Sequence, residues 1–316
     1  MNTTLPSKND LLKVYADIRE RVHNTPVLES SSLNQLAGAK MYFKCENFQR
    51  MGAFKMRAAV NAILRLSEEE KSRGVVTHSS GNFGQAVALA AKELGVQAYV
   101  VMPANAPAVK KAAVASYGGI ITECEPTLAA RQFEANRIRE GVNASFLHPS
   151  NDLDVILGNA TAAMELLEVV PDLDIIVVPV GGGGLVAGTS LAVNYFGKQC
   201  KTIGAEPLMV DDAWRSLQSG NIEINKSAET VADGLRTNLG SVNFPIIREL
   251  VSEIIRVEED EIVSSLKLIW ERMKVVVEPS SAVPLAAVLK EQGKFAGSKV
   301  GIILSGGNVN LEKLPF

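Results

Sequence analysis

An apolar run from residue 175 to residue 180 is followed at once by four glycines, at positions 181 to 184. A continuous apolar run of this length predicts a strand buried on both faces of a sheet. Residues 185–196 then show the pattern of a helix. The four glycines are therefore expected between a buried strand and a helix, at the edge where open α/β sheets bind ligands.

Strands and helices are predicted to alternate along most of the chain. One block has strands at 75–78, 98–102, 120–122 and 144–147, with helices at 82–94, 108–117 and 128–140. The other has strands at 175–180, 202–206, 254–257 and 300–304, with helices at 155–167, 185–196, 211–218, 260–274 and 281–291. The pattern predicts a doubly wound α/β protein with two open sheets. We expect residues 1–73 and 150–316 to form a large domain and residues 74–149 a smaller inserted one.

Composition and charge exclude several classes of protein. The 316 residues suffice for two domains, and a net charge of −3 gives no basic footprint for nucleic acid. No apolar run reaches the length of a membrane span, and the first residues lack the apolar core of a signal peptide. Cys45, Cys124 and Cys200 are scattered, which argues against a disulfide framework or a zinc site. The chain is predicted to be cytoplasmic and to bind neither nucleic acid nor membrane.

Three further segments carry the residue types of a ligand site. Lys55 follows Phe54 in the segment FQRMGAFKMRAA, Ser79-Ser80-Gly81-Asn82 follows a predicted strand, and Ser305-Gly306-Gly307-Asn308 follows the last one. Each alone has a plainer interpretation: a surface lysine, a helix N-cap and a C-terminal turn. Taken with the glycine run, they indicate a phosphate-bearing cofactor held covalently by the lysine. The spaced G-x-G-x-x-G pattern is absent, so a monophosphate fits better than a dinucleotide.

These segments, in this order, resemble those of the fold type II pyridoxal-phosphate enzymes, within which serine racemases and threonine or serine dehydratases are the most similar. The resemblance implies that Lys55 binds pyridoxal 5'-phosphate covalently, with Phe54 beside its ring. It further implies that Asn82 binds the ring 3-hydroxyl and Ser305 the ring nitrogen. The phosphate would lie on the four consecutive glycines, Gly181, Gly182, Gly183 and Gly184.

The same resemblance assigns substrate-binding residues. Ser80 would exchange a proton on the cofactor face opposite Lys55, and two bases on opposite faces permit racemisation. Ser79 belongs to the same turn. Arg131 aligns with an arginine that binds the substrate carboxylate, and Thr237 with a substrate-binding serine; solvent exposure on a polar helix is the alternative for Arg131.

A divalent cation is also expected from the resemblance. Glu206 and Asp212 match two carboxylates that, with the backbone carbonyl of Val210, bind Mg²⁺ in the racemases. Carboxylate and carbonyl oxygens suit a hard cation of this kind. Without the resemblance they would be interpreted as loop acids.

Some residues depart from the family pattern. Phe83 stands where histidine is common, Met51 where threonine or serine is common, and Ala58 where glycine is frequent. Gly158-Asn159-Ala160-Thr161 replaces the usual Gly-Gln-Gly-Thr. These changes leave the native substrate and any nucleotide effector site open.

The resemblance therefore implies dehydration of a small β-hydroxy amino acid such as serine, threonine or 3-hydroxyaspartate, racemisation, or both. Dehydration would release a 2-oxo acid and ammonia. The alternatives are a β-replacement enzyme and a catalytically degenerate binding protein of the same fold. A homodimer is expected, with the N-terminal helix as one candidate interface.

Overall fold

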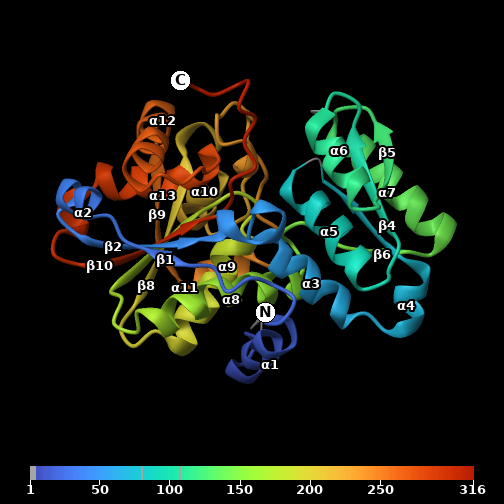
Figure 1. The fold of residues 1–316 in the computed structure, drawn as a ribbon, viewed down its shortest axis with the longest axis horizontal. Helices are drawn as coiled ribbons and strands as arrows, with labels where there is room; N and C mark the ends of the chain where they lie inside the picture. The colour runs from blue at the N-terminus through green and yellow to red at the C-terminus, as the bar shows by residue number, and fades with distance from the viewer. Residues whose placement is uncertain (1–4, 80, 107) are drawn as a thin grey trace.

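The computed structural model describes residues 5–79, 81–106 and 108–316, which form two open sheets in two lobes (Figure 1). The larger sheet contains, in spatial order, β1 (Val27–Leu28), β2 (Lys40–Cys45), β10 (Lys299–Leu304), β7 (Ile175–Pro179), β8 (Lys201–Pro207) and β9 (Val251–Val257). All its neighbouring strands are parallel except the β1–β2 pair. The apolar run before the four glycines is thus a central strand, as its composition predicts.

Helices cover both faces of the larger sheet, as a parallel sheet requires. One face packs against α1 (Lys8–Ile18), α3 (Lys55–Arg65), α8 (Leu153–Val169), α9 (Gly184–Phe196), α10 (Asp212–Ser219) and α11 (Phe244–Leu250). The other packs against α2 (Ser31–Ala37), α12 (Glu259–Leu268), α13 (Pro279–Lys290) and α14 (Gln292–Phe295). In the view of Figure 1, α8, α9 and α11 lie below the strands, and α2, α12 and α13 lie above them.

The smaller sheet is parallel throughout and lies in the right-hand lobe of Figure 1. Its order is β5 (Ile120–Cys124), β4 (Ala98–Pro103), β3 (Val75–His78) and β6 (Ser145–Phe146). Its connections contain α5 (Asn82–Glu93), α6 (Ala108–Ser116) and α7 (Leu128–Val142), and α4 (Glu68–Arg73) leads into it. All four strands lie within residues 75–146. The division into a large and a small domain, with its boundaries, stays a prediction.

The predicted fold class is confirmed, and the differences are local. The prediction missed α2 and α11, since each has only 7 residues and shows little periodicity. The helix predicted over 260–274 leaves α-helical geometry after Leu268, where a π-helical turn, Ile269–Met273, follows. Lys274 then ends it at a φ of 60°, in the left-handed region that terminates helices.

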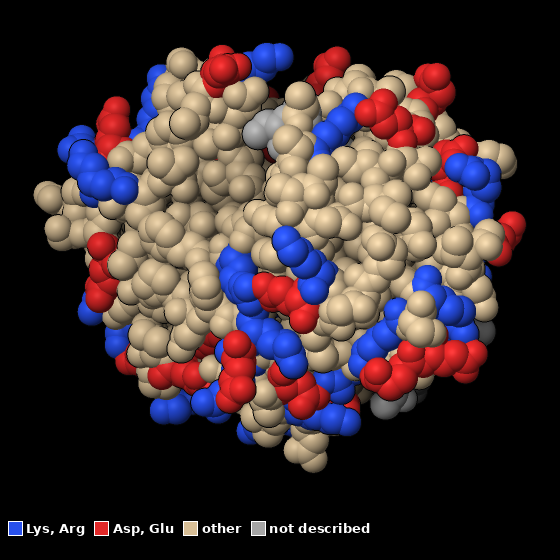
Figure 2. All heavy atoms as spheres, turned by 45° about the vertical axis from the view of Figure 1, so that its right-hand side comes forward, with Lys and Arg blue, Asp and Glu red and all other residues tan. Residues whose placement is uncertain are grey.

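The surface drawn in Figure 2 has acidic and basic side chains interspersed along its lower part and its upper rim, with a largely uncharged area between them. On this face the basic and acidic side chains are mixed and do not form a wide patch of a single sign. Within the described ranges of the chain, no helix combines the length and the apolar character needed to cross a membrane.

Candidate active site

Lys55 is the first residue of α3, and its side chain is partly buried between the two lobes. Its Nζ donates a hydrogen bond of 2.6 Å to the carbonyl of Pro149 and lies 4.8 Å from the ring centroid of Phe54 and 5.5 Å from that of Phe83. Burial lowers the pKa of Lys55 to about 8, although the nearby charge of Glu278 opposes this. The amine is therefore partly neutral near physiological pH, the form in which it can act as a nucleophile.

The four glycines form the turn between β7 and α9, and close packing explains why they lack side chains. A Cβ on Gly182 would lie 2.5 Å from the Ser150 hydroxyl and 2.9 Å from the Thr237 hydroxyl. Gly183 has a φ of 81°, which disfavours any other residue. All four glycines are buried, and among the described residues the N–H groups of Gly181, Gly182 and Gly183 have no hydrogen-bond partner.

Orphan N–H groups at a helix N-terminus favour an anion. Ser150 adds a buried hydroxyl beside them and directly follows Pro149, the residue that accepts the Lys55 hydrogen bond. The predicted phosphate loop and the predicted lysine are thus brought together by residues 149–150. Ser150 was missed from the sequence because it lies in a loop with no recognisable pattern.

The turn before α5 faces the larger domain. Asn82 Nδ2 lies 3.0 and 3.1 Å from the two carboxylate oxygens of Glu278, and its Oδ1 accepts a hydrogen bond of 2.9 Å from Asn308. The predicted bond between Asn82 and a cofactor hydroxyl stays a prediction. Ser79 Oγ accepts a hydrogen bond from the N–H of Gly81, and Ser80 lies outside the described residues.

Glu278 is a further residue that the sequence reasoning missed. It is 5% exposed, and burial raises its pKa to about 7, helped by Asp233 and opposed by the hydrogen bond from Asn82. One signal was visible: an acidic residue directly after the apolar segment 275–277. A carboxyl group that titrates near neutrality, beside a lysine of lowered pKa, is a common feature of active sites.

Ser305 follows β10 and is buried. Its carbonyl accepts a hydrogen bond of 3.0 Å from the N–H of Phe54, which fixes the end of β10 against the start of the lysine helix. Its hydroxyl lies 3.1 Å from that of Ser281 on α13. Lys55, the glycine turn and Ser305 therefore all lie at the carboxyl edge of the larger sheet.

These residues define a class of protein: an α/β enzyme that holds a phosphorylated cofactor against a reactive lysine. Residues 18–306 match the family described as "Pyridoxal-phosphate dependent enzyme". The chain belongs to this family, as its sequence motifs predicted.

Individual relatives agree with this assignment. The chain is 49% identical to serine racemase of Dictyostelium discoideum over 96% of its own length and 95% of the relative's. The crystal structure of that racemase superposes with a TM-score of 0.92, covering 96% of this chain and 98% of the other. The β-hydroxyaspartate dehydratase of Paracoccus denitrificans is 44% identical over 99% of both chains. Maize serine racemase is 44% identical, with a TM-score of 0.94 over 96% of this chain and 94% of that one.

The residues present fit pyridoxal phosphate. The buried N–H groups of the glycine turn lack an acceptor among the described residues, and a side chain on any of Gly181, Gly182 and Gly183 would approach other atoms within 3.0 Å. Lys55 supplies the amine, Phe54 and Phe83 apolar surface beside it, and Ser305 a hydroxyl at the strand end.

The remaining predicted substrate residues come from two elements. Arg131 is near the start of α7, partly exposed, with one long hydrogen bond of 3.4 Å to the Thr127 carbonyl. Its charge contributes to a lowered pKa of His78, an effect due mainly to burial. Thr237 is exposed and faces the glycine turn.

His148 lies in the loop after β6, and its Nδ1 accepts hydrogen bonds from the N–H groups of Ser150 and Asn151. Its ring also lies 5.9 Å from that of His78. Burial lowers the pKa of His148 to about 4, with further contributions from His78 and Lys55. The imidazole is therefore neutral and adjoins the site.

The predicted metal ligands lie close together in the chain: Glu206 in β8, Val210 in the short turn that follows it, and Asp212 as the first residue of α10. Glu206 is buried and accepts hydrogen bonds from the N–H groups of Ala213 and Trp214, at 3.1 and 2.9 Å. Asp212 is also buried and accepts from Asn225 and from the N–H of Leu239. Burial raises the pKa of both carboxyl groups, and for Glu206 the charge of Asp212 adds to this effect. Among the described residues, neither has a lysine or arginine within salt-bridge distance, and no three potential metal-binding side chains cluster.

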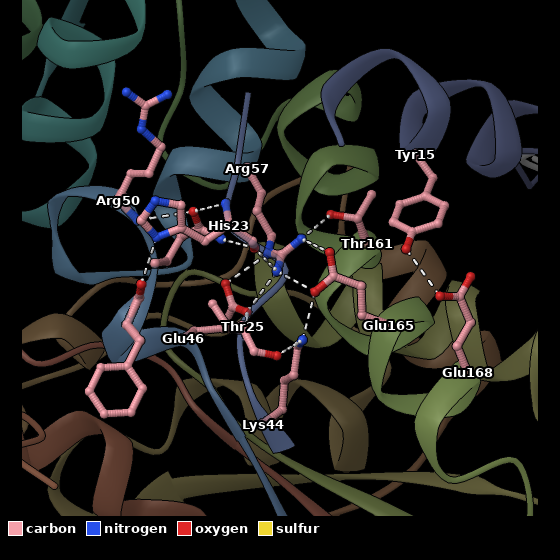
Figure 3. Close-up of polar contacts among 12 residues, drawn as sticks. Tyr15, His23, Thr25, Lys44, Glu46, Arg50, Arg57, Thr161, Glu165 and Glu168 are labelled. Atoms are coloured by element: carbon pink, nitrogen blue, oxygen red, sulfur yellow. Dashed lines mark hydrogen bonds and ion pairs between the residues drawn. The ribbon is translucent and has the colours of Figure 1, made fainter. Parts of the chain in front are cut away.

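A network of buried charges holds the helix that carries Lys55 (Figure 3). Arg57 donates to both oxygens of Glu46, at 2.7 and 2.9 Å, and to both oxygens of Glu165, each at 2.7 Å. Lys44 donates to Glu165 at 2.6 Å. Two cations face two carboxylates, so the network is neutral. It joins β2, α3 and α8, and no pattern along the chain indicated these pairings.

We expect replacement of Glu278 by glutamine to change how stability depends on pH. The pKa of Glu278 is raised in the folded protein, so the folded state binds more protons between about pH 4.5 and pH 7 than the unfolded state. The contribution of Glu278 to the free energy of unfolding therefore falls by on the order of 3 kcal/mol as the pH rises through that window. The Glu278→Gln variant should not show this fall. Urea unfolding of the cofactor-free protein from pH 5 to pH 9 measures it.

Glu249, an exposed carboxylate on α11, supplies the matched control as Glu249→Gln, whose pH profile should match that of the unmodified protein. A Glu278→Gln profile parallel to the unmodified one would contradict the raised pKa.

Proposed function

We propose that this protein binds pyridoxal 5'-phosphate on Lys55 and catalyses the dehydration of a small β-hydroxy amino acid, its racemisation, or both. Serine, threonine and 3-hydroxyaspartate are the candidate substrates. The observation that carries the proposal is the juxtaposition of the Lys55 amine, whose pKa is lowered to about 8, with the buried N–H groups of the glycine turn, which have no partner among the described residues. The named activities of its relatives, serine racemase and β-hydroxyaspartate dehydratase, support it.

The roles of the protein side chains follow from their positions. When bound, pyridoxal phosphate supplies an electron sink for the negative charge that develops on the substrate Cα. Lys55 Nζ accepts the Cα proton, for which its lowered pKa suits it. Loss of the β-hydroxyl as water, followed by hydrolysis, yields a 2-oxo acid and ammonia. Ser80 is proposed, from the family resemblance, to carry a proton on the opposite face.

Substrate binding is assigned to the small domain and to the loop between α10 and α11. Arg131 is proposed to bind the α-carboxylate, because an arginine fork suits a carboxylate. It has no acidic partner among the described residues, which supports this role. Ser79 and Thr237 are proposed to complete the pocket with hydroxyl groups.

The test is a panel of purified D- and L-serine, D- and L-threonine and the stereoisomers of 3-hydroxyaspartate. We expect oxo-acid release, enantiomer exchange or both with at least one of them. If none gives either product while the cofactor is bound to Lys55, the proposed reaction is wrong. Product formed only when an external nucleophile is added would identify a β-replacement enzyme.

We further propose that Glu206, Asp212 and the carbonyl of Val210 bind Mg²⁺. Two buried carboxylates without a basic partner among the described residues leave negative charge that a hard cation would neutralise. Mg²⁺ at 100 times its Kd should then stabilise the protein by about 2.7 kcal/mol, with EDTA reversing the effect. Thermal unfolding with and without Mg²⁺ measures this.

The Asp212→Asn variant should lose the response to Mg²⁺, whereas Glu229→Gln, at an exposed acid in the following loop, should keep it. An equal Mg²⁺ response in the Asp212 variant would place the ion elsewhere.

We also propose a cytoplasmic homodimer. The helix α1 is proposed as part of the interface, from the resemblance to the family. Analytical ultracentrifugation of the purified protein measures its oligomeric state. A monomer at micromolar concentration would exclude the dimer.

A further inference from the structure

The ring of His148 accepts hydrogen bonds from two consecutive backbone N–H groups in the loop between β6 and α8. Its Nδ1 lies 3.2 Å from the nitrogen of Ser150 and 2.8 Å from that of Asn151. A backbone N–H can only donate, so Nδ1 must present a lone pair to both. Burial lowers the pKa of His148 to about 4, so the ring is neutral near pH 7 and carries one hydrogen. That hydrogen is therefore on Nε2.

The loop held by this ring contacts both parts of the candidate site. Pro149 stands between His148 and Ser150, and its carbonyl accepts a hydrogen bond of 2.6 Å from Lys55 Nζ. The hydroxyl of Ser150 lies so close to Gly182 that a Cβ on this glycine would approach it to 2.5 Å. Two neighbouring residues thus place a hydrogen-bond partner of the lysine and a hydroxyl beside the N–H groups of the glycine turn.

Other contacts join the same loop to the glycine turn and to the start of α11. Asn243 Nδ2 donates to the Ser150 carbonyl at 3.0 Å and to the Gly182 carbonyl at 2.8 Å. Asn151 Oδ1 accepts from the N–H of Val242 at 2.6 Å. These contacts use the carbonyl of Ser150 and the side chain of Asn151. Among the described residues, the two N–H groups of the loop bond to the imidazole alone.

The ring itself packs against the smaller sheet. Its centroid lies 5.9 Å from that of His78, the last residue of β3, and 6.2 Å from that of Phe146 in β6, both in edge-on arrangements. The position of the imidazole is therefore fixed by the smaller sheet, while its Nδ1 holds the loop that adjoins the glycine turn.

We infer that His148 is a positioning residue: the lone pair of its Nδ1, in the tautomer with the hydrogen on Nε2, holds residues 149–150 where they meet Lys55 and the cofactor phosphate. The inference rests on the proposed function, in which the phosphate lies on the glycine turn. Without this acceptor, the N–H of the buried Ser150 would lose its partner, and an unpaired buried N–H is costly. The loop would then shift toward another acceptor, and the Ser150 hydroxyl would leave the glycine turn.

The first experiment is ¹⁵N NMR of the cofactor-free protein, labelled at histidine, near pH 7. The chain contains three histidines, and the signals of His148 are those missing from the His148→Asn variant. We expect an unprotonated Nδ1 and a protonated Nε2. A hydrogen on Nδ1 overturns the inference.

The second experiment measures the affinity for pyridoxal 5'-phosphate by equilibrium dialysis. His148→Leu removes the acceptor and should weaken binding about tenfold. Asparagine carries its Oδ1 on Cγ, as histidine carries Nδ1, so His148→Asn should restore most of the affinity. Glutamine places its polar atoms one bond further out, nearer to the position of Nε2, so His148→Gln should bind as weakly as the leucine variant.

His23→Leu is the matched control. His23 is an exposed histidine whose Nδ1 lies 3.0 Å from the Phe48 carbonyl, and this variant should bind the cofactor as the unmodified protein does. Thermal unfolding of each cofactor-free variant shows whether it is folded. If His148→Leu does not fold, the asparagine and glutamine variants make the comparison. Unchanged affinity in folded His148→Leu, or equal affinities of the asparagine and glutamine variants, overturns the inference.

Failure of the underlying function gives a different result. Borohydride reduction and peptide mapping of the unmodified protein show whether the cofactor is attached to Lys55. Absence of attachment overturns the proposed function and this inference with it. Attachment to Lys55, together with a hydrogen on Nδ1 of His148 or an affinity that does not depend on residue 148, overturns this inference alone.

Discussion

Replacement of Lys55 by alanine is expected to abolish covalent incorporation of pyridoxal phosphate and to lower the turnover number for oxo-acid release by about 10⁴-fold. The reason is that the same amine binds the cofactor and accepts the substrate proton, so both functions are lost together. Borohydride reduction followed by peptide mass mapping measures incorporation, and oxo-acid release measures turnover.

Two controls separate charge from nucleophilicity. Lys55→Arg keeps a cation at the site but has no free amine, and it should fail as alanine does. Lys71→Ala removes a lysine on α4 that pairs with Glu68, and it should keep both incorporation and turnover. A pyridoxyl mass on a peptide without residue 55 would refute the assignment of Lys55.

The second large effect is expected at Arg57. Arg57→Met should destabilise the cofactor-free protein by about 3–5 kcal/mol, because it leaves Glu46 and Glu165 buried with Lys44 as the one remaining cation of the network. The charge of Arg57 holds the pKa of Glu46 below its usual range despite burial, which shows that the pair is strongly coupled. Urea unfolding near pH 7 gives the free energy.

Glu68→Gln breaks an exposed ion pair with Lys71 and should change stability by less than about 0.5 kcal/mol. If Arg57→Met costs under about 1 kcal/mol, the network does not stabilise the fold as its geometry indicates. Lys55 is two residues from Arg57 on the same helix, so the variant should also bind the cofactor more weakly.

The local elements were predictable because their signals are local. The run before the glycines forms β7 as predicted, and a capping box of Ser67 and Glu70 begins α4. The helices predicted over 82–94 and 155–167 also form, as α5 and α8. Each of these depends on residues a few positions apart.

The departures from the family pattern acquire structural explanations that the sequence did not offer. The backbone of Met51 has a φ of 55°, in the left-handed region that residues other than glycine rarely adopt. The side chain of Asn308 donates a hydrogen bond to the Met51 carbonyl. Ala58 lies where α3 meets α8, and a Cβ on Gly158 would approach its Cα to 2.8 Å. Phe83 lies beside Lys55 and is buried.

The sequence by itself determined the fold class, the lysine and the glycine turn, and through its motifs the family, because strand and helix periodicity and short motifs are properties of neighbouring residues. Only the tertiary structure decided which distant side chains contact the residues of these motifs. Glu278 meets Asn82 across 196 positions, and Arg57 meets Glu165 across 108. Burial, pKa shifts and hydrogen-bond direction depend on such distant partners, and no pattern along the chain encodes which of them come together.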